Sequence, residues 1–245
     1  MRILPKLVLL APFFLLLHPV PAFATDASAS AAPRFAVPIL CTEAQSAART
    51  KARGTAVVVD LSGIILTAAH VVSQSQLFCT LTALVPNDEW TRASGFRPFS
   101  VEQCVTNELL DIALCRIKPR GNNRDWSYLR AASIRMQIPP PASSVVITGF
   151  TGWGYFPTVV HGRIASPQQL YRRQDGCYCD FAVDTLTYEG MSGSPLVTEQ
   201  GDVIGLITTA GTGKFRGISF GTSFERAAAF LRKAGLTSAS LAPKK

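Results

Sequence analysis

Short apolar runs separated by turn-forming residues recur along most of this chain, and they limit the folds open to it. The runs have strand length and Gly, Pro or Asn lies between many of them, whereas helical patterns are scarce. Many short strands joined in this way are typical of β-barrels and β-sandwiches, so the sequence predicts an all-β protein. The runs are Gly54 to Leu61, Gly63 to Val72, Gln76 to Val85, Phe99 to Thr106, Ile112 to Ile117, Ser144 to Phe150, Thr158 to Ala165, Tyr178 to Asp184, Pro195 to Thr198, Val203 to Thr208 and Gly217 to Thr222.

One stretch interrupts the strand pattern. Residues 119–142 contain Gly121-Asn122-Asn123 and Pro139-Pro140-Pro141, where strand pairing should lapse. This break divides the chain into halves of similar size, and we interpret residues 121–142 as a linker. After the last strand, Phe224 to Lys233 carries apolar residues at helical spacing, which predicts a terminal helix with one packed face.

Three stretches contain residue types that work together in acyl transfer. His70 ends Leu66-Thr67-Ala68-Ala69-His70, Asp111 begins Asp111-Ile112-Ala113-Leu114, and Ser192 lies in Gly190-Met191-Ser192-Gly193-Ser194-Pro195. A serine hydroxyl is a weak nucleophile at neutral pH, so an imidazole must accept its proton and a carboxylate must fix the imidazole tautomer. The order His, Asp, Ser differs from the orders in α/β-hydrolases and subtilisins. We expect His70, Asp111 and Ser192 to act as base, orienting carboxylate and nucleophile.

These stretches, in this order, resemble those of trypsin-like serine proteases. The runs Val145 to Gly154 and Gly201 to Leu206 are similar to segments of bacterial proteases of the high-temperature-requirement and glutamyl-endopeptidase kind. The resemblance covers about residues 50–232. It implies two six-stranded antiparallel β-barrels packed across a catalytic cleft, with a short C-terminal helix. It also implies a serine endopeptidase that acts on proteins or peptides through an acyl-enzyme.

The expected division of the chain follows from the strand pattern and this resemblance. It comprises a signal peptide (1–24), an N-terminal extension (25–48), the first barrel (49–120), the linker (121–142), the second barrel (143–223), and a C-terminal helix and tail (224–245). A peptide-binding domain, which usually follows in the high-temperature-requirement proteases, is not expected after Lys245.

The N-terminus predicts export. Arg2 and Lys6 precede the apolar run Leu7 to Leu17, and small residues flank Phe23, so cleavage is expected after Ala24. The apolar run is too short for a membrane span of ~20 residues. We therefore expect a periplasmic or extracellular protein that keeps no stable membrane anchor.

All six cysteines follow the predicted signal peptide, and an even number in an oxidising compartment favours disulfides. The pairing does not follow from sequence, although a bridge between Cys104 and Cys115 would hold the loop that carries Asp111. Cys177 and Cys179 would point to opposite faces of a strand and should not pair. A zinc site would need four ligands and only His161 is left to help, so we expect no metal and no cofactor.

The other histidines and the net charge of +8 suggest no separate function. His18 lies in the predicted signal peptide, and His161 lies in a strand-like run with no carboxylate nearby in sequence, which favours a structural role. Basic residues occur in pairs without interleaved aromatic residues, so we expect no nucleic-acid partner. Attraction to anionic envelope components or acidic substrates remains an alternative.

The nucleophile loop predicts further parts of the site. Gly190 and Gly193 allow the backbone to turn tightly around Ser192, and the backbone amides of Gly190 and Ser192 would form the oxyanion hole. Digestive relatives have an Asp in place of Met191 that pairs with a newly cut N-terminus. Activation by that ion pair is therefore not expected here.

The resemblance also implies a substrate pocket with Leu186 as its floor. Its walls would come from Thr187, Thr208, Thr209 and Ala210. The floor carries no acid, which disfavours cleavage after Lys or Arg, and Ile207 replaces a histidine used by glutamyl-specific relatives. We expect a small or medium apolar residue on the acyl side of the cut, and the Thr208 hydroxyl is expected to donate to Asp111.

A different class of function also remains open. The chain could be a catalytically silent or latent protein with the protease fold that binds or scaffolds partners, although none of the three expected catalytic residues is missing.

Overall fold

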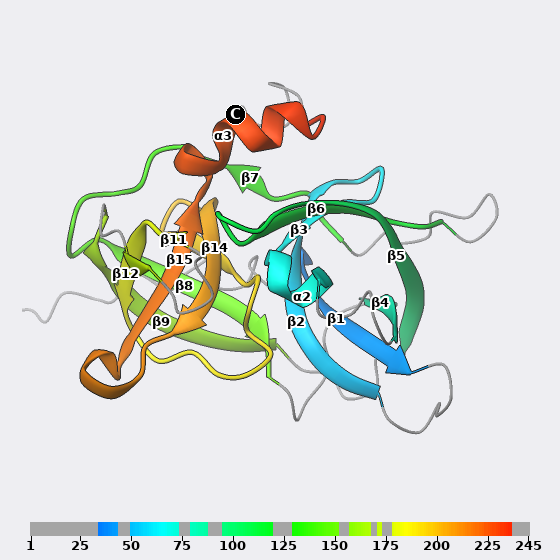
Figure 1. The fold of residues 1–245 in the computed structure, drawn as a ribbon, viewed down its shortest axis with the longest axis horizontal. Helices are drawn as coiled ribbons and strands as arrows, with labels where there is room; N and C mark the ends of the chain where they lie inside the picture. The colour runs from blue at the N-terminus through cyan, green and yellow to red at the C-terminus, as the bar shows by residue number, and fades with distance from the viewer. Residues whose placement is uncertain are drawn as a thin grey trace, which may run out of the picture.

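The computed structural model describes residues 34–43, 50–73, 79–87, 95–119, 129–151, 157–167, 171–172 and 178–236. Two bodies built of strands lie side by side, with a C-terminal helix at one edge (Figure 1). The predicted signal peptide, most of the N-terminal extension, part of the predicted linker, and Cys177 lie outside the described residues.

The first body is a closed antiparallel barrel in the strand order β1-β2-β3-β6-β5-β4. Its interior is filled by residues such as Ile39, Val58, Ile65, Phe99 and Ile117, each at most 3% exposed. The strands are β1 (Ala36–Glu43), β2 (Thr50–Asp60), β3 (Ile64–Thr67), β4 (Cys79–Pro86), β5 (Phe96–Asn107) and β6 (Ile112–Ile117).

The start of this barrel corrects the expected division of the chain. Residues 36–43 were expected in an N-terminal extension, but they form β1, which pairs with both β2 and β4 and completes the barrel. The run contains Pro38, which lacks a backbone N–H and counts against a strand in a sequence pattern. Pro38 lies beside Thr55 of β2, and the neighbouring residues make the pairing.

The second body is also a closed barrel, because β13 pairs with both β8 and β14. Its order is β13-β8-β9-β12-β15-β14. The strands are β8 (Ser144–Phe150), β9 (Pro157–Ser166), β12 (Phe181–Asp184), β13 (Pro195–Thr198), β14 (Asp202–Ala210) and β15 (Ile218–Ser223). The expected pair of six-stranded antiparallel barrels is therefore confirmed.

Short elements surround this barrel. Ser133–Ile134 forms β7, a parallel addition to β14 from within the predicted linker. The strand expected over Tyr178 to Asp184 is divided at Asp180: Tyr178–Cys179 (β11) pairs with Tyr171–Arg172 (β10), and Phe181–Asp184 is β12. Gly213–Phe215 forms a 3-10 turn, η2.

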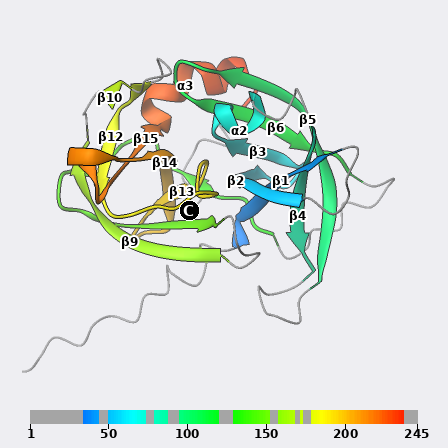
Figure 2. The ribbon, with the colours of Figure 1, turned by 60° about the horizontal axis from the view of Figure 1, so that its bottom comes forward.

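Helix α3 (Phe224–Lys233) has the predicted bounds and covers the junction of the two barrels (Figure 2). The Ser223 hydroxyl caps it by accepting a hydrogen bond from the Arg226 amide, 3.1 Å away. Its buried face, Phe224, Ala227 and Leu231, packs in a cluster that contains Leu66 of the first barrel and other residues from both barrels. This shared core packs the two barrels against each other.

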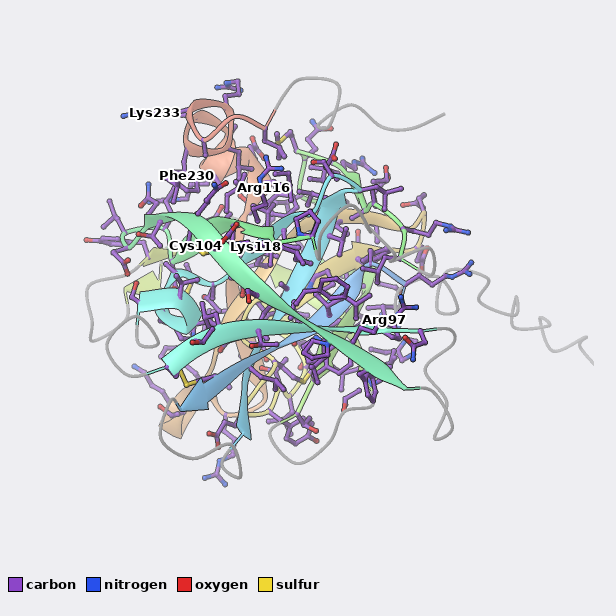
Figure 3. All side chains as sticks on the ribbon, turned by 90° about the vertical axis from the view of Figure 1, so that its right-hand side faces the viewer. Arg97, Cys104, Arg116, Lys118, Phe230 and Lys233 are labelled. Carbon is purple, nitrogen blue, oxygen red and sulfur yellow. A yellow bond between two sulfur atoms is a disulfide. The ribbon has the colours of Figure 1, made fainter. Side chains whose placement is uncertain are left out.

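Two disulfides reinforce the first barrel. Cys41–Cys79 joins β1 to β4, and Cys104–Cys115 joins β5 to β6, as the sequence suggested for the second pair. Figure 3 views this side of the molecule, where β5 runs between Arg97 and Cys104, with Phe230 and Lys233 of α3 above. No helix among the described residues is long and apolar enough to span a bilayer.

Candidate active site

His70 and Asp111 form a close pair at the edge of the first barrel. The expected strand through Val72 ends at Thr67, and His70 lies in the short helix α2 (Ala69–Ser73). His70 Nδ1 lies 2.8 Å from Asp111 Oδ2 and 3.0 Å from Oδ1, and the His70 backbone amide donates to Oδ1 at 2.9 Å. Since both partners of Nδ1 are carboxylate oxygens, Nδ1 carries the proton and Nε2 of the neutral ring keeps the lone pair.

The Asp111 loop depends on both barrels. Asp111 is 1% exposed and has a φ of +48°, a left-handed conformation that Asp adopts more readily than most residues. The loop is held from the second barrel, because the Tyr178 amide donates to the Leu109 carbonyl at 3.0 Å and the Thr222 hydroxyl donates to the Leu110 carbonyl at 2.6 Å. The position of the carboxylate is thus coupled to barrel docking.

Ser192 lies in the second of two consecutive tight turns. The Met191 amide donates to the Tyr188 carbonyl at 3.0 Å, and the Ser194 amide donates to the Met191 carbonyl at 3.0 Å. The third residue of each turn is a glycine with positive φ, Gly190 at +93° and Gly193 at +85°, as this type of turn requires. The Met191 side chain is fully buried in the core of the second barrel and so anchors the loop there.

The backbone amides of Gly190 and Ser192 are the two groups expected to hold an oxyanion. Within the described part of the chain, neither amide donates a hydrogen bond to another residue. The neighbouring amides of Met191, Gly193 and Ser194 all have carbonyl acceptors. The amides of Gly190 and Ser192 are therefore the two in this loop that can donate hydrogen bonds to a bound group.

His70 and Ser192 line one pocket of about 210 Å³, to which the second barrel contributes the other lining residues. Of the residues expected to bind substrate, Thr187, Thr208, Thr209 and Ala210 line it. Ile207, at the wall position where glutamyl-specific relatives have a histidine, also lines it, and so do Tyr188 and Glu189, which the sequence prediction left out. Tyr188 and Glu189 directly precede Gly190 in the sequence, and this position beside the nucleophile motif could have identified them.

Two expected details of the pocket are wrong. Leu186 was expected to be its floor, but this side chain is 49% exposed and does not line the pocket. The Thr208 hydroxyl was expected to reach Asp111, but it lies 3.3 Å from Cys179 Sγ, a buried neighbour on β11. Both details depend on where side chains point, which residue spacing does not fix.

A chain of hydroxyl hydrogen bonds lies behind the pocket wall. The Ser219 hydroxyl donates to the Thr185 carbonyl at 2.9 Å, and Ser219 Oγ lies 2.9 Å from Thr187 Oγ1. A carbonyl can only accept, so the single Ser219 proton is used there and Thr187 must donate to Ser219. The Thr187 hydroxyl therefore has no second proton to offer to a ligand in the pocket.

His161 lies elsewhere, as expected for a histidine outside the site. Its side chain is exposed on β9, in a separate surface hollow that Asp184 and Glu199 also line. Among the residues that the structure describes, no three His, Cys, Asp or Glu side chains are grouped so that they could hold a metal ion.

Comparisons with known proteins agree with this geometry. The trypsin-like peptidase domain family matches residues 54–206. The chain is 29% identical over 182 residues to the magnetosome formation protease MamE of Paramagnetospirillum magneticum, and 29% identical over 187 residues to HhoA of Synechocystis, which is described as a serine protease. These matches cover 73% and 74% of this chain but only 23% and 42% of MamE and HhoA.

A solved structure supports the fold. The active form of the Rv3671c protease from M. tuberculosis superposes with a TM-score of 0.65, with 20% identity and with 97% of each chain covered. At this identity the likeness concerns the fold alone. The family match, in contrast, spans most of the described chain and includes the stretches that carry His70, Asp111 and Ser192. The chain therefore belongs to the trypsin-like serine proteases.

Proposed function

We propose that this protein is an exported serine endopeptidase in which Ser192 is the nucleophile, His70 the general base and Asp111 the orienting carboxylate. The observation that carries the proposal is the pairing of His70 Nδ1 with the buried Asp111 carboxylate, beside the pocket that His70 shares with Ser192. The pairing leaves the basic lone pair on Nε2, which is the nitrogen that a serine nucleophile needs.

The proposed reaction proceeds through an acyl-enzyme. Ser192 Oγ attacks the scissile carbonyl while Nε2 of His70 takes its proton, and the resulting oxyanion is bound by the amides of Gly190 and Ser192. Such donors are worth roughly 3 to 4 kcal/mol each in the transition state. The imidazolium then gives its proton to the leaving amine as the C–N bond breaks. Water, deprotonated by His70, attacks the acyl carbonyl, and the Ser192–acyl bond breaks as the imidazolium returns this proton to Ser192 Oγ, which releases the acid.

For the residue on the acyl side of the cut, we propose a small or medium apolar side chain. The pocket of about 210 Å³ is smaller than the ~300 to 1,000 Å³ sites that hold drug-sized ligands. In its wall, Thr187 has no spare proton to donate to a carboxylate. The acid that lines the pocket, Glu189, is solvent-exposed and would repel an acidic side chain.

Export of the protein is part of the proposal. The two disulfides favour an oxidising compartment, where such bonds persist. The basic start and apolar run of residues 1–24 are the sequence features expected of a signal peptide. Intact-mass measurement of the purified exported protein would test this, with an N-terminus at Thr25 as the expected result.

A fluorophosphonate probe provides the direct test of the activity, because it phosphonylates only an activated serine. We expect one adduct on the wild-type chain by intact mass, its location on Ser192 by peptide mapping, and no adduct on Ser192→Ala. Peptide-library cleavage by the wild type would then rank the side chains accepted. A folded wild type that takes no adduct would instead indicate the latent or silent binding protein, and the catalytic proposal would be wrong.

A further inference from the structure

Thr55, on β2 of the first barrel, contacts the nucleophile loop of the second barrel through both its backbone and its side chain. Its amide donates to the Ser192 carbonyl at 2.8 Å, and its hydroxyl donates to the Gly190 carbonyl at 3.1 Å. Its hydroxyl also accepts from the Phe150 amide at 3.0 Å, and its carbonyl accepts from the Thr67 hydroxyl at 2.7 Å. Thr55 is completely buried.

The direction of the hydroxyl hydrogen bond is fixed by counting protons. An amide N–H can only donate, so Phe150 donates to Thr55 Oγ1 and the single hydroxyl proton remains for the Gly190 carbonyl. Thr55 thus holds both carbonyls of the residues whose amides are the proposed oxyanion donors, Gly190 by its hydroxyl and Ser192 by its amide.

The loop and β2 also touch through their backbones. A Cβ added to Gly54 would lie 2.9 Å from the Ser192 carbonyl oxygen, and one added to Gly193 would lie 2.1 Å from the Thr55 carbonyl oxygen. Such approaches are possible only because both residues are glycines. Gly190 has a φ of +93° and also lacks a Cβ, so its backbone dihedral angles have little intrinsic restraint.

We propose that the Thr55 hydroxyl is a positioning group for the oxyanion hole. It restrains the Gly190 carbonyl on the first-barrel side, which sets the orientation of the Gly190 backbone and so keeps its amide directed at the developing oxyanion. Thr55 does not touch the substrate. The inference rests on the proposed peptidase function, and it adds that the first barrel contributes to the oxyanion hole as well as to the base.

Thr55→Val tests this because it keeps the shape of the side chain and replaces the hydroxyl with a methyl group, which removes the donor to Gly190 together with the acceptor of the Phe150 amide. The matched control is Thr148→Val on β8, since Thr148 is equally buried and its hydroxyl has no hydrogen-bond partner among the residues that the structure describes. Thr55→Ser restores the hydroxyl. We expect Thr55→Val to lower kcat by about 10- to 100-fold, below the ~10²- to 10³-fold cost of deleting a donor, with KM changed less than about threefold. Thr55→Ser should recover most of kcat, and Thr148→Val should match the wild type.

A peptide aldehyde built on a cleaved sequence gives a second measure of the oxyanion hole. Its hemiacetal oxygen occupies the oxyanion position, so its Ki should weaken in Thr55→Val about as much as kcat/KM falls. If Thr55→Val keeps wild-type kcat and Ki, or if Thr55→Ser is as impaired as Thr55→Val, the proposal is wrong. Thermal unfolding of each variant identifies loss of fold, and if Thr55→Val is unfolded, the comparison is made between Thr55→Ala and Thr55→Ser.

Failure of the proposed function would be visible already in the wild type, as the absence of Ser192-dependent labelling. Hydrogen exchange of the bonded amides of Met191, Gly193 and Ser194 then still decides the positioning role. Exchange should be faster in Thr55→Val than in the wild type or Thr148→Val. Equal exchange in all three proteins would overturn the inference whatever the activity.

Discussion

Asp111 accepts hydrogen bonds from two nitrogens of His70, the ring Nδ1 at 2.8 Å and the backbone amide at 2.9 Å. One carboxylate therefore fixes both the plane of the imidazole and the helix turn on which it sits. Both residues belong to the first barrel, yet the loop carrying Asp111 is bonded to the second through the Leu109 and Leu110 carbonyls. The arrangement of the base thus requires that the two barrels are docked.

Asp111→Asn should leave the fold intact and lower kcat by about ten-thousandfold. The amide can donate to Nδ1, which stabilises the tautomer whose proton is on Nε2 and removes the basic lone pair from the side of the serine. Steady-state cleavage of a peptide substrate measures the effect, and circular dichroism verifies the fold. Near wild-type kcat in a folded Asp111→Asn protein would mean that Asp111 does not orient the base.

The two histidines of the predicted mature chain should behave differently. His70→Ala should lower kcat by about a millionfold, nearly as much as Ser192→Ala, because the three groups act as a unit. His161→Gln should leave kcat and KM within about twofold of the wild type, since His161 is exposed on β9 and does not line the active-site pocket. Severe loss of activity in His161→Gln together with retained activity in His70→Ala would mean that His70 is not the base.

Thr148→Val should leave the protein as stable as the wild type, or stabilise it by about 1 kcal/mol. The Thr148 hydroxyl is buried on β8 and finds no hydrogen-bond partner in the described part of the chain. An unsatisfied buried polar group costs free energy that a methyl group of the same shape does not. Urea unfolding of the two proteins measures the difference in the free energy of unfolding. A loss of more than about 1 kcal/mol would show that the hydroxyl makes a favourable interaction.

Features that depend on residue order and on periodicity could be predicted from the sequence. The strand periodicity predicted an all-β protein, and the resemblance to trypsin-like proteases in the stretches of His70, Asp111 and Ser192 implied the two barrels. The apolar spacing of Phe224 to Lys233 predicted α3 to the residue. Strand β1 was missed because Pro38 weakens its pattern, although pairing on both sides stabilises it.

Other features depend on contacts between distant residues. Sequence spacing cannot show that Leu186 points to solvent, that Thr208 lies against Cys179, or that Thr55 reaches Gly190 across 135 residues. The helix at His70 was likewise missed because its residues, Ala69 to Ser73, continue the apolar run of β3 and are too few to show a helical period. Tertiary packing, and not local propensity, decides such positions.

Removing the Cys104–Cys115 disulfide should reduce both stability and turnover. The two cysteines are 11 residues apart, and closing a loop of that length is worth about 3 kcal/mol in the unfolded state. Cys104→Ala/Cys115→Ala should lose about that much unfolding free energy, and kcat should fall because the bridge joins the strands on either side of Asp111. Cys41→Ala/Cys79→Ala is the matched control: it also loses stability, but β1 and β4 carry none of the proposed catalytic residues. An equal loss of kcat in both double variants, each assayed while folded, would contradict the local role.

Ser219→Ala should widen the substrate preference toward side chains that accept hydrogen bonds. The substitution removes the acceptor to which Thr187 now donates, so that the Thr187 proton becomes available inside the pocket. One new hydrogen bond of about 1 kcal/mol corresponds to roughly a fivefold rise in kcat/KM for a glutamine substrate relative to a valine substrate. Thr187→Val in the same background removes that proton and should cancel the gain, whereas Thr187→Val alone should not favour glutamine. A ratio of glutamine to valine cleavage that stays at the wild-type value in Ser219→Ala would mean that the Thr187 hydroxyl does not face the bound side chain.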